Sequence, residues 1–143
     1  MKYLLYIAIF FSLLACTSEP EPITYGKDYC QFCKMTIMEP QFAGELITKK
    51  GKVFKFDDVS CMVKYVNLEN LPETEYAFIL INDYNHKDFV NVSEAHFVHD
   101  DNIKSPMGGQ TIAFKEKLSA NNIPAQIGKD YEELNWAEIK AML

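Results

Sequence analysis

The feature that most restricts the folded part of this chain is its apolar N-terminal segment. The run from Tyr3 to Leu14 follows the single positive charge of Lys2 and is apolar except for Ser12. A membrane-spanning helix needs about 20 apolar residues, so this run is too short to cross a bilayer. It predicts instead a signal peptide over residues 1–15, and a folded domain must be built from the residues after it.

The end of this segment, Leu13-Leu14-Ala15-Cys16, resembles the lipobox of bacterial lipoproteins. In that class of signals the cysteine thiol takes the lipid and the cysteine becomes the first residue of the mature protein. Cys16 is therefore our candidate lipidation site, and the lipid bilayer is the partner that the anchor would contact. The alternative is an ordinary secreted protein in which Cys16 is structural.

Residues 16–24 are expected to form a lipidated, disordered tether, because this segment is polar and contains Pro20 and Pro22. The remainder, 25–143, is long enough for one compact domain. The whole chain carries a net charge of −6. An acidic chain without basic clusters argues against nucleic acid as a partner and against electrostatic docking on anionic lipid.

The stretch Cys30-Gln31-Phe32-Cys33-Lys34-Met35 concentrates two thiols and a thioether in a short distance along the chain. Thiolate and thioether sulfurs are soft ligands, which favour Cu(I). If residues 33–37 are extended, Cys33 and Met35 point to the same face, and Cys30 reaches it from the preceding turn. These three side chains are therefore candidate copper ligands. The alternative for Met35 alone is that it fills a gap in the core.

The number of cysteines also points to metal or redox chemistry. Cys16 is assigned to the anchor, so Cys30, Cys33 and Cys61 remain, an odd number in an oxidising compartment. A Cys30–Cys33 disulfide would leave Cys61 alone. Cys61 falls in the first turn of a predicted helix, where an exposed thiol has a lowered pKa. We favour a buried, hydrophobic role for it.

Local signals predict a hairpin followed by a helix in the first half of the domain. Segments 43–48 and 53–57 alternate apolar and polar residues on either side of a turn in which Gly51 can adopt a positive φ. Asp57 or Asp58 can then N-cap the next helix. Further along, the sequence predicts a central strand over 76–81, shorter strands over 89–92 and 111–114, and helices over 115–122 and 134–143, the latter capped by Asn135.

A second methionine lies in the segment Ser105-Pro106-Met107-Gly108-Gly109. Proline fixes the entry to this turn, and the two glycines permit backbone conformations closed to other residues. Met107 has few neighbouring side chains with which to form a core. The pattern predicts an exposed thioether presented to a partner or an ion, and the alternative is a plain turn.

Taken together, these features resemble the NosL family, lipoproteins that accompany nitrous-oxide reductase. The resemblance covers nearly the whole mature chain, and its most specific parts are the CxxCxM and SPMG motifs, in this order behind a lipobox. The matching segments are the lipobox ending at Cys16, residues 30–37, residues 56–59 and residues 105–114.

The resemblance implies a periplasm-facing, non-enzymatic Cu(I) metallochaperone, held on the inner or outer membrane, that loads nitrous-oxide reductase or a related cuproprotein. It implies an ABC-type membrane complex as a further partner. The implied fold is α+β, with two small β-β-α-β units packed together, which agrees with an internal similarity between residues 51–57 and 128–135. Carried onto this chain, the implied copper ligands are Cys33, Met35 and Met107, with Cys30 next.

Two other functions fit parts of the pattern. A thiol–disulfide oxidoreductase would use Cys30 and Cys33, but that motif normally opens a helix, and Pro40 leaves little room for one. A structural zinc site would need Cys61 and a histidine as well, yet the second close pair of ligands usual in such sites is missing. No histidine or pair of carboxylates lies near the CxxC motif in sequence, so we favour a carrier over an enzyme.

Overall fold

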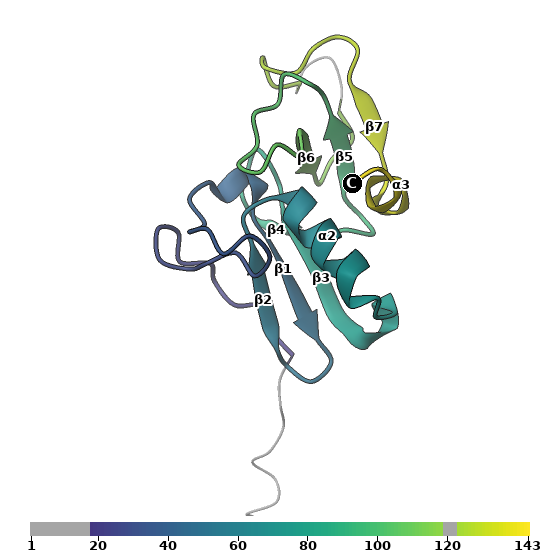
Figure 1. Cartoon of the computed structure of the whole chain (residues 1–143). Coiled ribbons are helices and arrows are strands. Elements are labelled where there is room, and N and C mark those ends of the chain that lie inside the picture. Colours follow the sequence, from purple (N-terminus) through teal and green to yellow (C-terminus); the bar gives the residue numbers. More distant parts are fainter. Residues whose placement is uncertain (1–17, 119–122) are drawn as a thin grey trace, which may run out of the picture.

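The computed structural model describes residues 18–118 and 123–143 and has the predicted α+β fold, with two small antiparallel sheets and two α-helices (Figure 1). The strands are β1 (Gly44–Thr48), β2 (Val53–Phe56), β3 (Tyr76–Asn82), β4 (Phe89–Asn91), β5 (His96–His99), β6 (Thr111–Phe114) and β7 (Glu132–Leu134). The helices are α2 (Val59–Glu69) and α3 (Trp136–Met142), with 3-10 turns at η1 (Pro40–Phe42) and η2 (Glu73–Glu75). The strand order is β2-β1-β3-β4 in the first sheet and β6-β5-β7 in the second.

The first half contains the predicted hairpin and helix. β1 pairs antiparallel with β2 around a turn in which Gly51 has a φ of 78°. Helix α2 begins directly after this hairpin because Asp58 caps it, with a carboxylate oxygen that accepts a hydrogen bond from the Ser60 N–H at 2.8 Å. The helix ends at Asn70 in the left-handed conformation. β3 then pairs with the other edge of β1 and, as predicted, occupies a central position.

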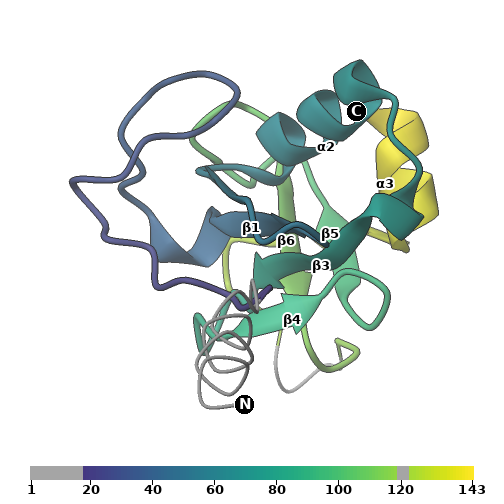
Figure 2. The same cartoon turned by 90° about the horizontal axis from the view of Figure 1, so that it is seen from below.

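Helix α2 packs across one face of the first sheet (Figure 2). Gly44 of β1 permits this close approach, because any Cβ at that position would overlap the Met62 side chain of α2. The layer between them is filled by buried apolar side chains, among them Leu46, Phe56 and Val63. Each such side chain contributes roughly 1.5–3 kcal/mol to folding when it is fully buried.

The second sheet has apolar side chains on both faces, as the alternation along β5 requires. Phe97 packs against Trp136 of α3 in the main core, with the ring centroids 5.9 Å apart. Its neighbour Val98 faces a smaller cluster that includes Ile112. Helix α3 begins after the predicted cap, Asn135, and buries Trp136 and Ile139.

The order of elements in the second half differs from the expected one. β1-β2-α2-β3 is a β-β-α-β unit, whereas the second half runs β5-β6-β7-α3 and places its helix after its third strand. The helix predicted over 115–122 is absent from its described part, residues 115–118, and residues 119–122 lie outside the described part of the chain. The Lys115 N–H donates to the Asp83 carboxylate at 2.8 Å, a bond that holds the chain in a bend.

The last residues of the predicted tether, Pro22 and Ile23, contact the folded domain. Residues 1–15 and Cys16 lie outside the described residues, and residues 18–24 form neither helix nor strand. Nevertheless Ile23 is only 8% exposed and belongs to the main core, and the Pro22 carbonyl accepts a hydrogen bond from Lys55 at 3.0 Å. None of the helices in the described part of the chain is long and apolar enough to span a bilayer.

Candidate metal centre

The CxxC motif forms a tight turn ahead of the first sheet. The Lys34 N–H donates to the Cys30 carbonyl at 3.0 Å, and the Cys30 N–H donates to the Met35 carbonyl at 2.8 Å. Lys34 closes the turn with a φ of 65°. The condition that residues 33–37 are extended is therefore not met at Cys33 and Lys34, although Thr36 pairs with Tyr29 in an isolated antiparallel bridge. The alternation of a strand does not place Cys33 and Met35 on one face. The turn brings Cys30 and Cys33 close together instead.

This turn is held against the end of β2. The Gln31 N–H donates to the Lys55 carbonyl at 2.7 Å. Because the turn is bound there, Cys33 lies beside Asp57, the residue directly after β2. The Cys33 Sγ lies 3.5 and 3.6 Å from the two oxygens of the Asp57 carboxylate. Asp57 is only 2% exposed, so this contact is shielded from water.

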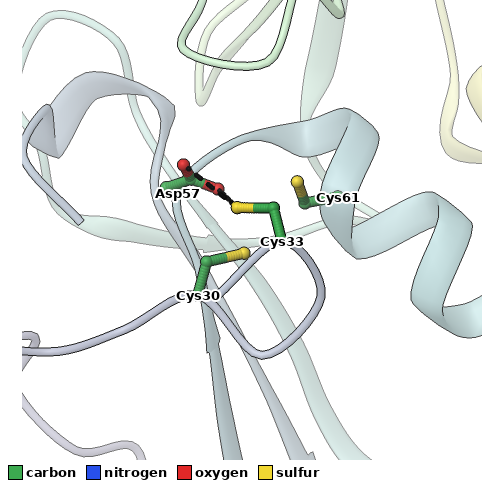
Figure 3. Close-up of side chains that lie close together, drawn as sticks. All are labelled: Cys30, Cys33, Asp57 and Cys61. Carbon is green, nitrogen blue, oxygen red and sulfur yellow. Dashed lines mark hydrogen bonds between the residues drawn. The ribbon is translucent and has the colours of Figure 1, made fainter. Parts of the chain in front are cut away.

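Helix α2 adds a third thiol to the same place. Cys61 lies in the first turn of α2 and is 1% exposed. One ligand atom from each of Cys30, Cys33, Asp57 and Cys61 lies within 4.8 Å of the others (Figure 3). We call these four residues the thiol cluster. The prediction that Cys61 is buried is confirmed. The sequence did not reveal that its sulfur lies next to two other thiols.

The neighbouring thiols shift one another's pKa values. A hydrogen bond from the Cys61 thiol lowers the pKa of Cys30 from its usual 9 to about 7. The same contact raises the pKa of Cys61. Burial raises the pKa of Cys33 to about 11. Cys30 is therefore the thiol of the cluster that ionises most readily near neutral pH, and a thiolate is the form that binds metal.

Met107 reaches the start of helix α2 from the second half of the chain. Its backbone N–H donates to the second carboxylate oxygen of Asp58 at 2.9 Å. Gly109 lies so close to α2 that any Cβ there would come within 2.7 Å of Asp58 and of Ser60. The Met107 side chain is 37% exposed, as predicted for a presented thioether. Asp57 faces Cys33 and the adjacent Asp58 holds the Met107 loop, so these two aspartates connect the loop to the thiol cluster.

Met35 comes directly after the cysteine turn and is 55% exposed, so it does not fill a gap in the core. The structure thus brings Cys30 and Cys33 together and leaves both predicted thioethers open to solvent. Sequence reasoning considered Asp57 only as a helix cap and left Cys61 out of the ligand set. One available signal was their spacing of four residues, which places two side chains on the same side of a helix start.

The donor set of the thiol cluster can be compared with each of the chemistries that the sequence suggested. Three sulfurs favour a soft metal ion, and Cu(I) above all among the copper oxidation states. The fourth group is the Asp57 carboxylate, whereas the zinc alternative required a histidine. A thioredoxin-like arrangement would place a helix directly after the CxxC motif, and residues 34–38 form no helix.

Known proteins agree with this description. No curated protein sequence matches the chain significantly. Its fold is similar to that of a crystal structure described as the copper chaperone NosL from Shewanella denitrificans, with a TM-score of 0.66 and 22% sequence identity. The similarity covers 85% of this chain and 96% of that chain. Residues 22–141 match the NosL family, and the chain therefore belongs to the NosL family.

Proposed function

We propose that this protein is an extracytoplasmic carrier of Cu(I). The observation that supports this most strongly is the convergence of Cys30, Cys33 and Cys61 within 4.8 Å of one another, next to the loop that presents Met107. Soft sulfur donors select Cu(I) over the harder metal ions. The proposed copper ligands are Cys30, Cys33, Met35 and Met107.

The exposure of these sulfurs suits a carrier better than an enzyme. Cys30 is fully buried and Cys33 is half-buried, while Met35 and Met107 are exposed. A copper ion on such a site can be reached by the ligands of an acceptor through the thioether side and released by ligand exchange. Membership of the NosL family and the likeness to a copper chaperone both support a non-catalytic role.

The acceptor we propose is nitrous-oxide reductase or a related cuproprotein, with an ABC-type membrane complex as a further partner. Membership of the NosL family supports both. The proposed location is the periplasmic face of a membrane, with a lipid on Cys16 as anchor. Ile23 packs in the core of the domain, so the anchor would hold the domain close to the bilayer.

Copper transfer tests the proposal. The chain is loaded with one equivalent of Cu(I) under argon and mixed with copper-free nitrous-oxide reductase, and the two proteins are separated and assayed for copper. We expect most of the copper to move to the reductase, and retention of the copper by the carrier would contradict this acceptor. Cys16→Ala should move the protein from the membrane fraction to the soluble fraction, and continued membrane association would contradict the anchor.

One observation favours a second candidate function, a thiol–disulfide oxidoreductase that uses Cys30 and Cys33. The pKa of Cys30 is lowered to about 7 by the Cys61 thiol, and a lowered thiol pKa is typical of such enzymes. This alternative predicts that the chain catalyses reduction of a protein disulfide in the absence of copper. Tight Cu(I) binding without such activity would favour the carrier.

A further inference from the structure

The thiol cluster contains one donor that a Cu(I) carrier does not need. The Asp57 carboxylate is buried and lies 3.5 Å from the Cys33 sulfur, although carboxylate oxygen is a poor ligand for Cu(I). Nitrogen and oxygen donors suit Cu(II) instead. The Asp57 carboxylate can therefore bind copper as Cu(II), and the adjacent Cys33 thiolate can bind it as Cu(I).

The cluster also contains two thiols more than a site of one cysteine and two thioethers requires. Cys30 and Cys61 form an inner pair, with exposed fractions of 0% and 1%. Cys33 is half-buried, contacts the carboxylate and lies nearer the surface. Figure 3 shows the three sulfurs together, with Cys61 approaching from α2 and the other two from the turn. The geometry separates an inner dithiol from an outer ligand.

We propose that the protein accepts copper as Cu(II) and reduces it to Cu(I) with the inner pair, Cys30 and Cys61. In this step Cys33, Met35 and Met107 retain one Cu(I), and Cys30 becomes available as a further ligand once the disulfide is reduced again. This inference rests on the proposed function, because it supplies the ion that the carrier would deliver. It adds an activity, the reduction of cupric ion by a dithiol, to the binding of Cu(I).

The electrons balance with two cupric ions for each disulfide. Each Cu(II) gains one electron, the S–H bonds of Cys30 and Cys61 break, one S–S bond forms, and two protons pass to the solvent. One Cu(I) stays on Cys33 and the other leaves to a ligand in solution. The two sulfurs start within 4.8 Å and must approach to about 2 Å. A dithiol reductant of the extracytoplasmic space would return the pair to its reduced form.

The test uses the mature chain, residues 16–143, with Cys16→Ala in every sample so that the cluster supplies all of the thiols. The protein is reduced, freed of reductant under argon, and mixed with two equivalents of Cu(II). Electron paramagnetic resonance records the loss of the Cu(II) signal, and alkylation with subsequent peptide mass spectrometry locates the disulfide. We expect the loss of two equivalents of Cu(II), a Cys30–Cys61 disulfide, and about one copper retained per chain after desalting.

The variant Cys61→Ala, which lacks one thiol of the inner pair, is compared with the wild type. Circular dichroism checks that it is folded, and Cys61→Ser replaces it if it is not. Either variant leaves Cys30 and Cys33 as the only thiol pair, so reduction should oxidise the outer ligand and retained copper should fall at least tenfold. A persistent Cu(II) signal in the wild type, a Cys30–Cys33 disulfide there, or equal copper retention by the variants would overturn the proposal. A wild type that does not bind Cu(I) supplied as Cu(I) would instead contradict the proposed function.

Discussion

The two halves of the molecule contain the same local junction, a short strand that leads directly into a capped helix. In the first half β2 leads to α2 through Asp58, and in the second β7 leads to α3 through Asn135. Both caps accept a hydrogen bond from a backbone N–H in the first helical turn, at 2.8 Å for Asp58 and 3.1 Å for Asn135. The similarity between residues 51–57 and 128–135 predicted this correspondence.

The junctions differ in what the remaining polar atoms contact. At Asn135 the Glu138 side chain returns to the cap and accepts its backbone N–H at 2.7 Å, so the capping box is closed within α3. At Asp58 the second carboxylate oxygen accepts the Met107 N–H from the other half, and the preceding Asp57 faces Cys33. The comparison shows that a capping aspartate, whose second oxygen is free to accept another hydrogen bond, can hold a loop from a distant part of the chain next to the thiol cluster.

Buried acids show a similar contrast between the halves. The Asp100 carboxylate accepts the backbone N–H groups of Asn102 and Gly128, and the bond from Asn102 lowers its pKa. Glu45 of β1 is fully buried with one oxygen that has no hydrogen-bond partner, and burial raises its pKa to about 7. The half that carries the thiol cluster thus also holds an unfavourable buried charge.

The largest effect on stability is expected from Glu45→Gln. The folded state holds the Glu45 proton more tightly than the unfolded state, so the stability of the wild type should fall as pH rises from about 4.5 to 7 and stay low above that range. At pH 8 the variant should therefore be more stable by on the order of 2 kcal/mol. Below pH 4.5 the difference should disappear, because both states of the wild type are then protonated.

Urea denaturation at pH 4.5, 6 and 8 measures this dependence. Asp100→Asn provides the control of opposite sign. The lowered pKa of Asp100 stabilises the folded protein above the usual pKa of 3.8, so this variant should be less stable than the wild type by the same amount at all three pH values. If the difference in unfolding free energy between Glu45→Gln and the wild type does not vary with pH, Glu45 does not have a raised pKa in the folded protein.

A smaller effect, on copper affinity, is expected from Met107→Leu. Leucine keeps the size of the side chain and removes the thioether, so Cu(I) affinity should fall about tenfold, or about 1.4 kcal/mol. Met142→Leu is the matched control, since Met142 is similarly exposed but lies at the end of α3. Competition with a chromophoric Cu(I) chelator measures both variants. Equal affinities would remove Met107 from the ligand set.

The smallest effect, and the most direct test of the contrast between the junctions, is expected from Asp58→Asn. Asparagine caps a helix as well as aspartate does through its amide oxygen, but the amide nitrogen that replaces the second carboxylate oxygen cannot accept the Met107 N–H. Cu(I) affinity should fall severalfold, roughly 1 kcal/mol, while the helix content stays the same. Asn135→Asp also preserves its cap and should leave the affinity unchanged. Similar affinities for the two variants would show that Asp58 does not position Met107.

Much of the fold arises from local signals in the sequence. Gly51 marks the hairpin turn, and Asp58 and Asn135 mark the two helix starts, because turn and cap preferences act over a few residues. The bend at Lys115 could not be predicted in this way, since the bond that favours it comes from Asp83, which is distant in sequence.

The candidate site was only partly predictable for the same reason. Cys30, Cys33 and Met107 are marked by their own motifs. Cys61 joins the thiol cluster because the cysteine turn is bound to β2 through the Gln31 N–H and the Lys55 carbonyl, a contact between segments far apart in the chain. Residues 33–37 are not extended throughout because Lys34 adopts a positive φ, which lysine seldom does.

The most direct test of a copper site at the first junction is an anaerobic competition titration with Cu(I). The full chain is compared with the double variant Cys30→Ser, Cys33→Ser, and Asn135→Ala serves as a control that weakens only the second junction. We predict one tightly bound Cu(I) in the wild type and in the control, and at least about a 100-fold weaker affinity in the double variant, close to 2.7 kcal/mol. Equally tight binding by the double variant would contradict the assignment of the site.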